Sequence, residues 1–374
     1  MSEKYFNVTH KMVMAKDVRE TTGKKYKVGS LFSGCGGMDL GFLGGFEFGG
    51  REYGDNPFEI MFSNDIFEQA ADCYEANLGH HVIRTSICDI EEQDFPKCEI
   101  DILLGGFPCQ TFSLAGKRKG LSDPRGQLYL QMIRVLDHYK PKMFVAENVD
   151  GIRNSKKDHH GEAVDKSALE IILDDFDAHG YAVQYRVLNA ADYGVPEIRR
   201  RVIITGIRKD LGDEMDVFYP FPVRSEDGKG TNGALWMTAR DAIDDLWDVV
   251  NKTSIPNHTS RDISKAKFYP GKKLQGNNRI KGDYPSPTIR AEHHGNIEAH
   301  YRTLDMENPN NMEGWRRLSV RECARLQSFP DSYNFICSSS SAYKAIGNAV
   351  PPVMAWHIAR SILKTLEGMD KSRG

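Results

Sequence analysis

Cys109 has the sequence surroundings of a reactive nucleophile. It follows Pro108 in the segment GGFPCQTFS, directly after an apolar run, and a loop rich in Gly, Lys and Arg comes next. A cysteine reacts as its thiolate, which a polar, positively charged and partly exposed setting favours. The other six cysteines have no such flanks and fit a small apolar core role. Position 112 is Phe, so the Pro-Cys-x-x-Cys of a zinc deaminase is missing, and no metal site is expected.

Two further features could serve such a nucleophile. Glu147 ends the apolar run MFVAE, where a carboxylate can contact a ring nitrogen, although a cap or turn role is the simpler alternative. In the run of three arginines, strand alternation places Arg199 and Arg201 on one face and Arg200 on the other. One face can therefore point into a pocket while the other pairs at the surface.

Residues that follow three other apolar runs outline a pocket for an adenosine. The turn FSGCGG has glycines that let backbone approach a ligand, and the helix start after it favours an anionic group. Asp65 stands where a carboxylate commonly binds ribose hydroxyls, and Asp89 where one can bind an adenine amino group. Each alone is more often a cap or turn residue. Without a Walker-type lysine, the set favours an adenosine carrying a small reactive group over a triphosphate.

The apolar runs that carry these residues are expected to be strands, with helices between them. The expected strands are 28–32, 60–64, 100–105, 143–147, 181–188 and 200–207, and the expected helices are 65–78, 127–139, 166–179, 318–327 and 350–366. This alternation predicts an α/β fold with a mainly parallel sheet and helices on both faces. In such sheets ligands bind beyond the carboxyl ends of the strands, which is where the polar residues stand.

The 374 residues allow a large α/β domain with an insertion. We expect an extension (1–26), a catalytic and cofactor-binding domain (27–211), a variable basic domain (212–300) and a return to the catalytic domain (301–374). The seven cysteines are scattered without a CxxC pair, so no disulfide framework is indicated. No apolar run approaches the roughly 20 residues of a membrane span, and the first ten residues lack a signal-peptide core. A cytoplasmic protein without a membrane partner is expected.

Charge is distributed unevenly along the chain. The net charge is -3, yet residues 251–290 contain nine Lys or Arg and two Asp. Such a basic segment within an acidic protein suits a local polyanion site, whereas a solvated charged surface is the alternative. Arg279 and Arg290 are candidates to read base edges in this segment. Lys117 and Arg118, in the loop after Cys109, are candidates to contact phosphates.

Taken in order, several segments resemble the motif series of the cytosine-5 DNA methyltransferases. They are FSGCGG, SND, GGFPCQTFS, ENV, DYGVP with the arginine run, RRLSVRECARLQSFPD and GNAVPP. The resemblance runs from about Val28 to Arg360, except for roughly 212–300, where that family carries its variable target-recognition domain. It implies a class I S-adenosylmethionine-dependent methyltransferase (Rossmann-like) fold with a smaller target-recognition domain. It further implies S-adenosyl-L-methionine as methyl donor, double-stranded DNA as substrate, and a functional pairing with a restriction endonuclease.

The resemblance also implies roles for individual residues. Cys109 matches the nucleophile and Glu147 the carboxylate of the ENV motif, with Arg201 at the cytosine O2 and Arg199 holding Glu147. Gln110 and Ser113 match loop residues that close over DNA. The residues that match cofactor contacts are Phe32, Gly34, Gly36, Gly37, Asp65, Ile66, Asp89, Ile90, Pro108, Leu128, Asn348 and Ala349.

Four departures and three alternatives accompany this reading. Ser30 stands where Asp often precedes the first glycine turn of the family, and Cys88 where Gly is frequent before Asp89. Glu197 and Ile198 occupy positions that are often Gln and Asn in the family, which affects hydrogen bonding rather than the reaction. A tRNA cytosine methyltransferase would share the catalytic residues, and a non-catalytic DNA-binding homologue would share the fold. A dinucleotide-dependent dehydrogenase fits least, because the FSGCGG turn lacks GxGxxG spacing. A monomer is expected, and the recognition sequence is left open.

Overall fold

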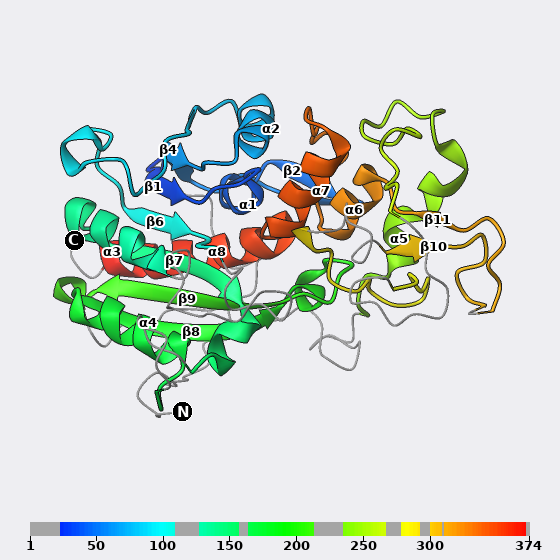
Figure 1. The fold of residues 1–374 in the computed structure, drawn as a ribbon. Helices are drawn as coiled ribbons and strands as arrows, with labels where there is room; N and C mark the ends of the chain where they lie inside the picture. The colour runs from blue at the N-terminus through cyan, green and yellow to red at the C-terminus, as the bar shows by residue number, and fades with distance from the viewer. Residues whose placement is uncertain are drawn as a thin grey trace.

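The computed structural model describes residues 23–108, 127–156, 164–212, 235–266, 278–291, 300–308 and 310–371. Within them the central feature is a seven-stranded sheet of order β5-β4-β1-β6-β7-β9-β8 (Figure 1). Its strands are β1 (Tyr26–Leu31), β4 (Phe58–Asn64), β5 (Val82–Ile83), β6 (Ile102–Gly105), β7 (Met143–Val149), β8 (Tyr181–Asn189) and β9 (Arg200–Arg208). In this sheet β9 alone runs against its neighbours, so the expected mainly parallel sheet is confirmed.

The register of the sheet brings the ends of four strands together. Leu31 pairs with Asn64 on one side and with Gly105 on the other, and Gly105 pairs in turn with Ala146. Because these strands are parallel, their carboxyl ends form one edge. The antiparallel β9 begins at that same edge, where Arg201 lies opposite the end of β7. Residues that follow β1, β4, β6 and β7 and residues that start β9 are thus neighbours in space.

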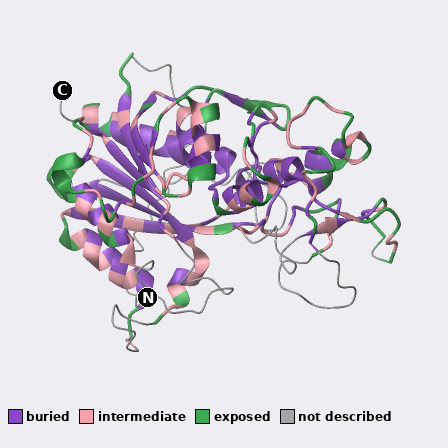
Figure 2. Cartoon of the chain, turned by 45° about the horizontal axis from the view of Figure 1, so that its top comes forward, coloured by how far each residue is buried: buried purple, intermediate pink, exposed green. Residues whose placement is uncertain are grey.

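Helices cover both faces of the sheet. The helices of the described residues are α1 (Gly37–Leu43), α2 (Glu68–Leu78), α3 (Tyr129–Tyr139), α4 (Ala168–Ala178), α5 (Ala239–Ile243), α6 (Val320–Leu326), α7 (Ser339–Asn348) and α8 (Pro352–Lys371), and not all of them lie on the sheet. Side chains alternate along β6: Ile102 and Leu104 join the core that contains α1 and α8, whereas Leu103 joins the core that contains α3 and α4. Figure 2 shows the buried strands between these two layers. Within the described residues no helix combines the length and apolar character needed to cross a bilayer.

The expected elements are found with shifted ends. The helix expected from residue 65 begins at Glu68, because Asp65 instead accepts a hydrogen bond from the Phe67 N–H at 2.7 Å. The last helix begins at Pro352, a residue that suits a first helical turn, and continues to Lys371. The hairpin of β2 (Phe46–Phe48) and β3 (Arg51–Tyr53) and the helix α7 were not expected.

A smaller part of the molecule lies beyond one end of the sheet (Figure 1). It contains α5, α6, a 3₁₀ turn at 244–249 and the antiparallel pair β10 (Tyr301–Arg302) and β11 (Arg316–Arg317). The other described 3₁₀ turns, at 92–94, 150–154, 190–193 and 209–211, precede or follow strands of the sheet. Arg302 is buried in the smaller part: its guanidinium donates to the Ile243 carbonyl at 2.8 Å and to Glu322 at 3.2 Å. The described residues before 300 therefore pack with those after it, and the expected domain boundary at 300 stays a prediction.

Candidate active site

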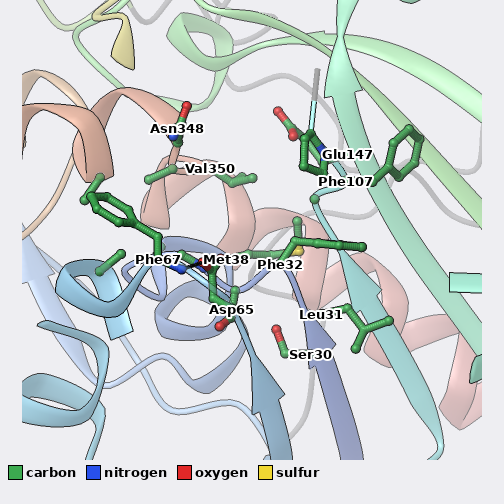
Figure 3. Close-up of a pocket in the computed structure, with 18 of the residues that line it drawn as sticks. Ser30, Leu31, Phe32, Met38, Asp65, Phe67, Phe107, Glu147, Asn348 and Val350 are labelled. Carbon is green, nitrogen blue, oxygen red and sulfur yellow. Dashed lines mark hydrogen bonds between the residues drawn. The ribbon is translucent and has the colours of Figure 1, made fainter. Parts of the chain in front are cut away.

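A cavity of about 330 Å³ lies at the sheet edge where the strands end. In Figure 3, Asp65 and Phe32 lie near the ends of β4 and β1, and Glu147 lies toward β7 beside Phe107. This volume lies within the range of small-molecule pockets. The predicted site residues that line the cavity are Phe32, Gly34, Gly37, Asp65, Ile66, Pro108, Leu128, Glu147, Arg199, Arg201, Asn348 and Ala349.

Three predicted cofactor residues are not among those lining the cavity. Gly36 begins α1 with φ 78°, and a Cβ there would lie 2.7 Å from the side chain of Leu78. Asp89 is exposed, and its N–H donates to the Ser86 carbonyl in a turn. Ile90 is half-buried, and its carbonyl accepts a bond from Arg134. A cofactor contact by these three residues stays a prediction.

Several predicted residues fall outside the described part of the chain. They are Cys109, Gln110, Ser113, Lys117 and Arg118. Pro108, which immediately precedes Cys109 in the sequence, is described and lines the cavity. The expected nucleophile thus follows directly from a residue at the cavity wall.

Asp65 ties the glycine-rich turn to the end of β4. Its Oδ2 accepts the Gly34 N–H at 2.8 Å and its Oδ1 accepts the Phe67 N–H at 2.7 Å. Burial raises the pKa of Asp65, while the two N–H bonds and the charge of Lys344 counteract that rise. Phe32 and Gly34 both have positive φ, 54° and 55°. The turn is therefore shaped by a half-buried carboxylate that also faces the cavity.

Residues from the far end of the chain complete the cavity through close backbone contacts. A Cβ at Gly37 would lie 2.3 Å from the Val350 carbonyl oxygen, so a glycine is needed where α1 meets this segment. Asn348 and Ala349 line the cavity between α7 and α8. The motif GNAVPP identified them in sequence, but their proximity to the turn after β1 is a tertiary contact.

Glu147 and Arg201 form an ion pair at the cavity wall. The Nε of Arg201 lies 2.8 Å from Oε1 of Glu147, and both side chains are about nine-tenths buried. Arg200 points the other way and pairs with Asp150 at 3.3 Å. The expected alternation of the arginine run is confirmed.

The expected role of Arg199 needs correction. The ion pair with Glu147 comes from Arg201, not from Arg199. Arg199 is buried, and its guanidinium donates to the carbonyls of Ile289 (3.1 Å), Gly347 (2.9 Å) and Ala349 (2.9 Å). Arg199 lies just before β9, and three carbonyls from other segments surround its guanidinium. A guanidinium has enough N–H donors to bind all three.

The sequence analysis did not identify two residues, Glu197 and Lys344, that lie at or next to the site. Glu197 is fully buried, and burial raises its pKa to about 7, partly offset by the charge of Arg199. Its spacing two residues before Arg199 on an extended segment is a signal for a shared face. Lys344 lines the cavity with its Nζ 4.2 Å from the Phe67 ring centroid. A lone lysine in a polar helix gives no comparable signal.

The two basic residues expected to read bases differ in their surroundings. Arg279 donates to the hydroxyl of Thr303 at 2.5 Å and to the carbonyls of Asp305 and Asn308. Its guanidinium thus supports the loop 303–308, and base reading by it stays a prediction. Arg290 packs its backbone against α7: a Cβ on Gly347 would lie 2.2 Å from the Arg290 carbonyl carbon.

The arrangement suits transfer of a group from a bound nucleoside to a second, planar substrate. One end of the cavity offers the half-buried carboxylate of Asp65 and a glycine-rich turn for a sugar and an anionic group. The other end offers the Glu147–Arg201 pair, which can hold a polar ring edge by charge-assisted hydrogen bonds. Together with the thiol expected just beyond Pro108, these are the groups required for nucleophilic catalysis on such a ring.

Comparisons with known proteins agree with this reading. The sequence profile of the C-5 cytosine-specific DNA methylases matches residues 26–364. The Type II methyltransferase M.NgoPII of Neisseria gonorrhoeae is 37% identical over 363 residues, covering 93% of this chain and 98% of its own. M.BsuRI of Bacillus subtilis is 34% identical over 403 residues, covering 97% and 86%.

Solved structures share the fold at lower identity. The Entamoeba histolytica methyltransferase EhMeth superposes with a TM-score of 0.65 at 14% identity, and S. pombe Dnmt2 with 0.62 at 20%; each covers 92% of this chain and 99% of its own. The expected fold class is confirmed. With the profile match across the sheet, the cavity and the Glu147–Arg201 pair, the chain belongs to the C-5 cytosine-specific DNA methylases.

Proposed function

We propose that this DNA cytosine-5 methyltransferase methylates C5 of a cytosine flipped out of double-stranded DNA, through a covalent bond between Cys109 and C6. The observation that carries the proposal is the buried Glu147–Arg201 pair, 2.8 Å apart, in the same cavity as the nucleoside-binding residues. Pro108, directly before Cys109, lines that cavity as well. In this proposal the methyl donor, the target cytosine and the nucleophile therefore share one cavity.

The residues of the cavity fit S-adenosylmethionine, the methyl donor of the family. Asp65 faces the cavity with a carboxylate suited to ribose hydroxyls, and Ile66 beside it is 66% exposed, which leaves an apolar surface for the adenine. The turn at Gly34 presents backbone to the amino-acid portion. When bound, the donor supplies an electrophilic methyl group.

The protein residues make C5 of cytosine able to accept that methyl group. The Cys109 thiolate adds to C6, and the electron pair of the C5–C6 bond then gives C5 the character of an enamine carbon. Glu147 shares a proton with N3 and accepts a hydrogen bond from the exocyclic amine, and the shared proton stabilises the charge that moves into the ring. In this proposal Arg201 donates to O2, and its ion pair with Glu147 supports that role by orienting the guanidinium. After transfer, the C5 proton leaves to a base such as water and the thiolate is expelled.

The target cytosine must leave the helix for this addition. A stacked and paired base does not expose C6 to a thiol, and flipping it costs a few kcal/mol of stacking and pairing. A cavity at the end of a sheet, rather than a flat surface, suits an extruded base. The basic segment 251–290 is proposed to bind the surrounding phosphates.

The relatives named Type II methyltransferases support a role in restriction-modification. We infer that the protein protects a short DNA sequence against a partner endonuclease, and that it acts as a cytoplasmic monomer on one strand at a time. To test the pairing, DNA that contains the endonuclease target is isolated from cells with and without this protein and is digested with the endonuclease. DNA from cells with the protein should resist cleavage.

The chemistry is tested by transfer of labelled methyl groups from S-adenosylmethionine to unmethylated genomic DNA and, in parallel, to tRNA. Bisulfite sequencing then locates the product. We expect label on DNA cytosines within one short sequence context. Cys109→Ala should abolish transfer while leaving cofactor binding intact, and Cys98→Ala, a partly buried cysteine packed against the core, serves as the matched control.

Three outcomes would contradict parts of the proposal. Turnover retained by Cys109→Ala would remove the covalent step. Label on tRNA alone would keep the chemistry and overturn the substrate. Cofactor binding without transfer to either nucleic acid would favour a non-catalytic DNA-binding homologue.

A further inference from the structure

Residues 286–291, here called the clamped segment, are bound to the short stretch that precedes β9. Ser286 forms a parallel bridge with Glu197, and its carbonyl accepts the Ile198 N–H at 2.8 Å. The Thr288 hydroxyl donates to the Ile198 carbonyl at 2.6 Å. The end of the basic region is therefore held in register with the strand that carries the catalytic arginine.

Glu197 stands at the centre of this contact. It is fully buried; its Oε1 accepts the Ile289 N–H at 2.5 Å and lies 3.7 Å from the Nη1 of Arg199. Among the described residues its Oε2 has no hydrogen-bond partner. A buried carboxyl oxygen without a partner is costly and calls for an explanation.

Arg199 extends the contact to the cofactor side of the cavity. Its guanidinium donates to the Ile289 carbonyl of the clamped segment and to the carbonyls of Gly347 and Ala349 at the end of α7. The backbone of Arg290 in turn touches Gly347 so closely that no side chain fits there. A shift of the clamped segment would consequently move the residues beside Asn348.

We propose that Glu197 is a positioning residue for methyl transfer, which holds the clamped segment against the cofactor residues and the catalytic arginine through Ile289 and Arg199. The inference rests on the proposed function, because it assumes that the clamped segment lies against bound DNA. Glu197 touches neither substrate nor cofactor in this role; it acts through Arg199 and the backbone of the clamped segment.

The charge of Glu197 tunes this contact near neutral pH. Burial raises the pKa of Glu197 to about 7, while the charges of Arg199 and Arg201 and the Ile289 N–H lower it in part. The charge of Glu197 also acts on Cys323 of α6, whose pKa burial raises. The ionised carboxylate attracts the Arg199 guanidinium, whereas the protonated acid keeps only the bond from Ile289.

The ionisation of Glu197 also makes the stability of the fold depend on pH. Because folding raises this pKa above that of the unfolded chain, protonated Glu197 favours the folded state below about pH 4.5, the ordinary value for Glu. That contribution is lost as pH rises through about 7. Glu197→Gln, which cannot ionise, should therefore melt like the wild type at or below about pH 4.5 and higher than the wild type at about pH 8.5, with the difference developing mostly between these two pKa values.

Kinetics of the full-length enzyme test the functional part. Glu197→Gln keeps the size and an acceptor for the Ile289 N–H but carries no charge. Near pH 6 its KM for DNA should match that of the wild type, and at about pH 8.5 it should be roughly fivefold higher, with KM for S-adenosylmethionine less affected. Arg200→Ala, on the exposed face of the same strand, is the matched control. The ratio of its KM for DNA to that of the wild type should be the same at both pH values.

The outcomes separate the inference from the proposed function. The inference would be overturned if two comparisons of Glu197→Gln with the wild type stayed constant across pH: the ratio of their KM values for DNA and the difference between their melting temperatures. Equal losses for DNA and for S-adenosylmethionine would reduce Glu197 to general structural support and overturn it as well. A wild type that methylates no DNA would overturn the proposed function, while the melting comparison still reports on Glu197. Glu197→Ala should raise KM for DNA about tenfold at both pH values; if it fails to fold, the Gln variant decides.

Discussion

At the scale of single residues, the site depends on a carboxylate and a guanidinium that hold each other. Both Glu147 and Arg201 are about nine-tenths buried, so their attraction is screened less by solvent than that of a surface pair. An arginine has a planar fork of donors, and the Nε that binds Glu147 leaves other N–H groups for a substrate carbonyl. The pairing thus orients Arg201 before any base arrives.

Replacing the carboxylate tests this assignment. Glu147→Gln should lower kcat by about 100-fold or more, because the ring charge loses its partner and Arg201 loses its orientation. Binding of S-adenosylmethionine, measured by calorimetry, should change little, since Asp65 and not Glu147 faces the expected ribose position.

Asp150→Asn supplies the control for Glu147→Gln. Asp150 pairs with Arg200 on the outer face, so this variant should keep kcat within about twofold. Equal effects of the two substitutions would contradict the separation of the two faces of the arginine run.

At the scale of elements, helices from the end of the chain reach the cavity only because glycines let backbones approach. Gly37 of α1 meets the Val350 carbonyl, and Gly347 of α7 meets the backbone of Arg290. A methyl group at either place would overlap backbone atoms, which cannot move as a side-chain end can. The turn after β1, the end of α7 and the clamped segment are consequently fixed as one unit.

Gly347→Ala should disturb that unit. The added Cβ would lie 2.2 Å from the Arg290 carbonyl carbon, and overpacking of this kind costs about 1–3 kcal/mol. We expect a lower free energy of unfolding in urea and weaker cofactor binding, because Asn348 is the next residue. Gly368→Ala in α8, with nothing within 4 Å of the added Cβ, should be neutral or stabilising by up to about 1 kcal/mol. Destabilisation of the same size in both variants would refute the steric argument.

A thiol pair joins α2 to the segment before α7. The Sγ atoms of Cys73 and Cys337 lie 3.5 Å apart, and the hydrogen bond between the two thiols lowers the pKa of Cys73. Two thiols this close can both bond to one trivalent arsenic. Phenylarsine oxide should therefore be retained against excess monothiol in the wild type and lost in Cys337→Ser. Retention in Cys337→Ser with loss in Cys98→Ser would show that other thiols form the pair.

At the scale of the whole molecule, charge is the property that must be reconciled with a DNA substrate. The chain carries a net charge of -3, which by itself disfavours a polyanion. The basic segment 251–290 has to outweigh that repulsion locally. Part of its charge is used internally, since Arg279 supports the loop 303–308. Exposed lysines such as Lys281 are then the better candidates for phosphate contacts.

The salt dependence of binding tests this distribution. Lys281→Ala should weaken DNA binding and reduce the slope of log K against log salt by about 1, as expected for one lost phosphate contact. Lys209→Ala, whose ammonium pairs with Asp177 beside the sheet, should leave the slope unchanged. The slope is measured by fluorescence anisotropy on a labelled duplex at several salt concentrations; identical slopes for both variants would place the DNA elsewhere.

Local sequence determined most of the fold. The runs ILLG of β6 and MFVA of β7 are continuously apolar because both faces of these strands are buried, and each is followed by residues that line the cavity. These are properties of short stretches of chain, so they can be read without a structure. The hairpin β2–β3 and the helix α7 were missed, since the hairpin strands have three residues each and α7 starts with a polar run of serines.

The partners of charged side chains were decided by the tertiary structure alone. Sequence placed Arg199 and Arg201 on one face and matched Glu147 to a catalytic carboxylate, but it assigned the Glu147 contact to the wrong arginine. For Arg279 nothing in the sequence indicated the loop 303–308, to which its guanidinium donates, and base reading by this residue stays a prediction. Motif order and strand alternation act over a few residues and specify which side chains share a face. Which of them meet depends on distances between segments some 50 to 150 residues apart, such as Arg201 to Glu147 and Arg199 to Gly347, and only the packing of the whole chain sets those distances.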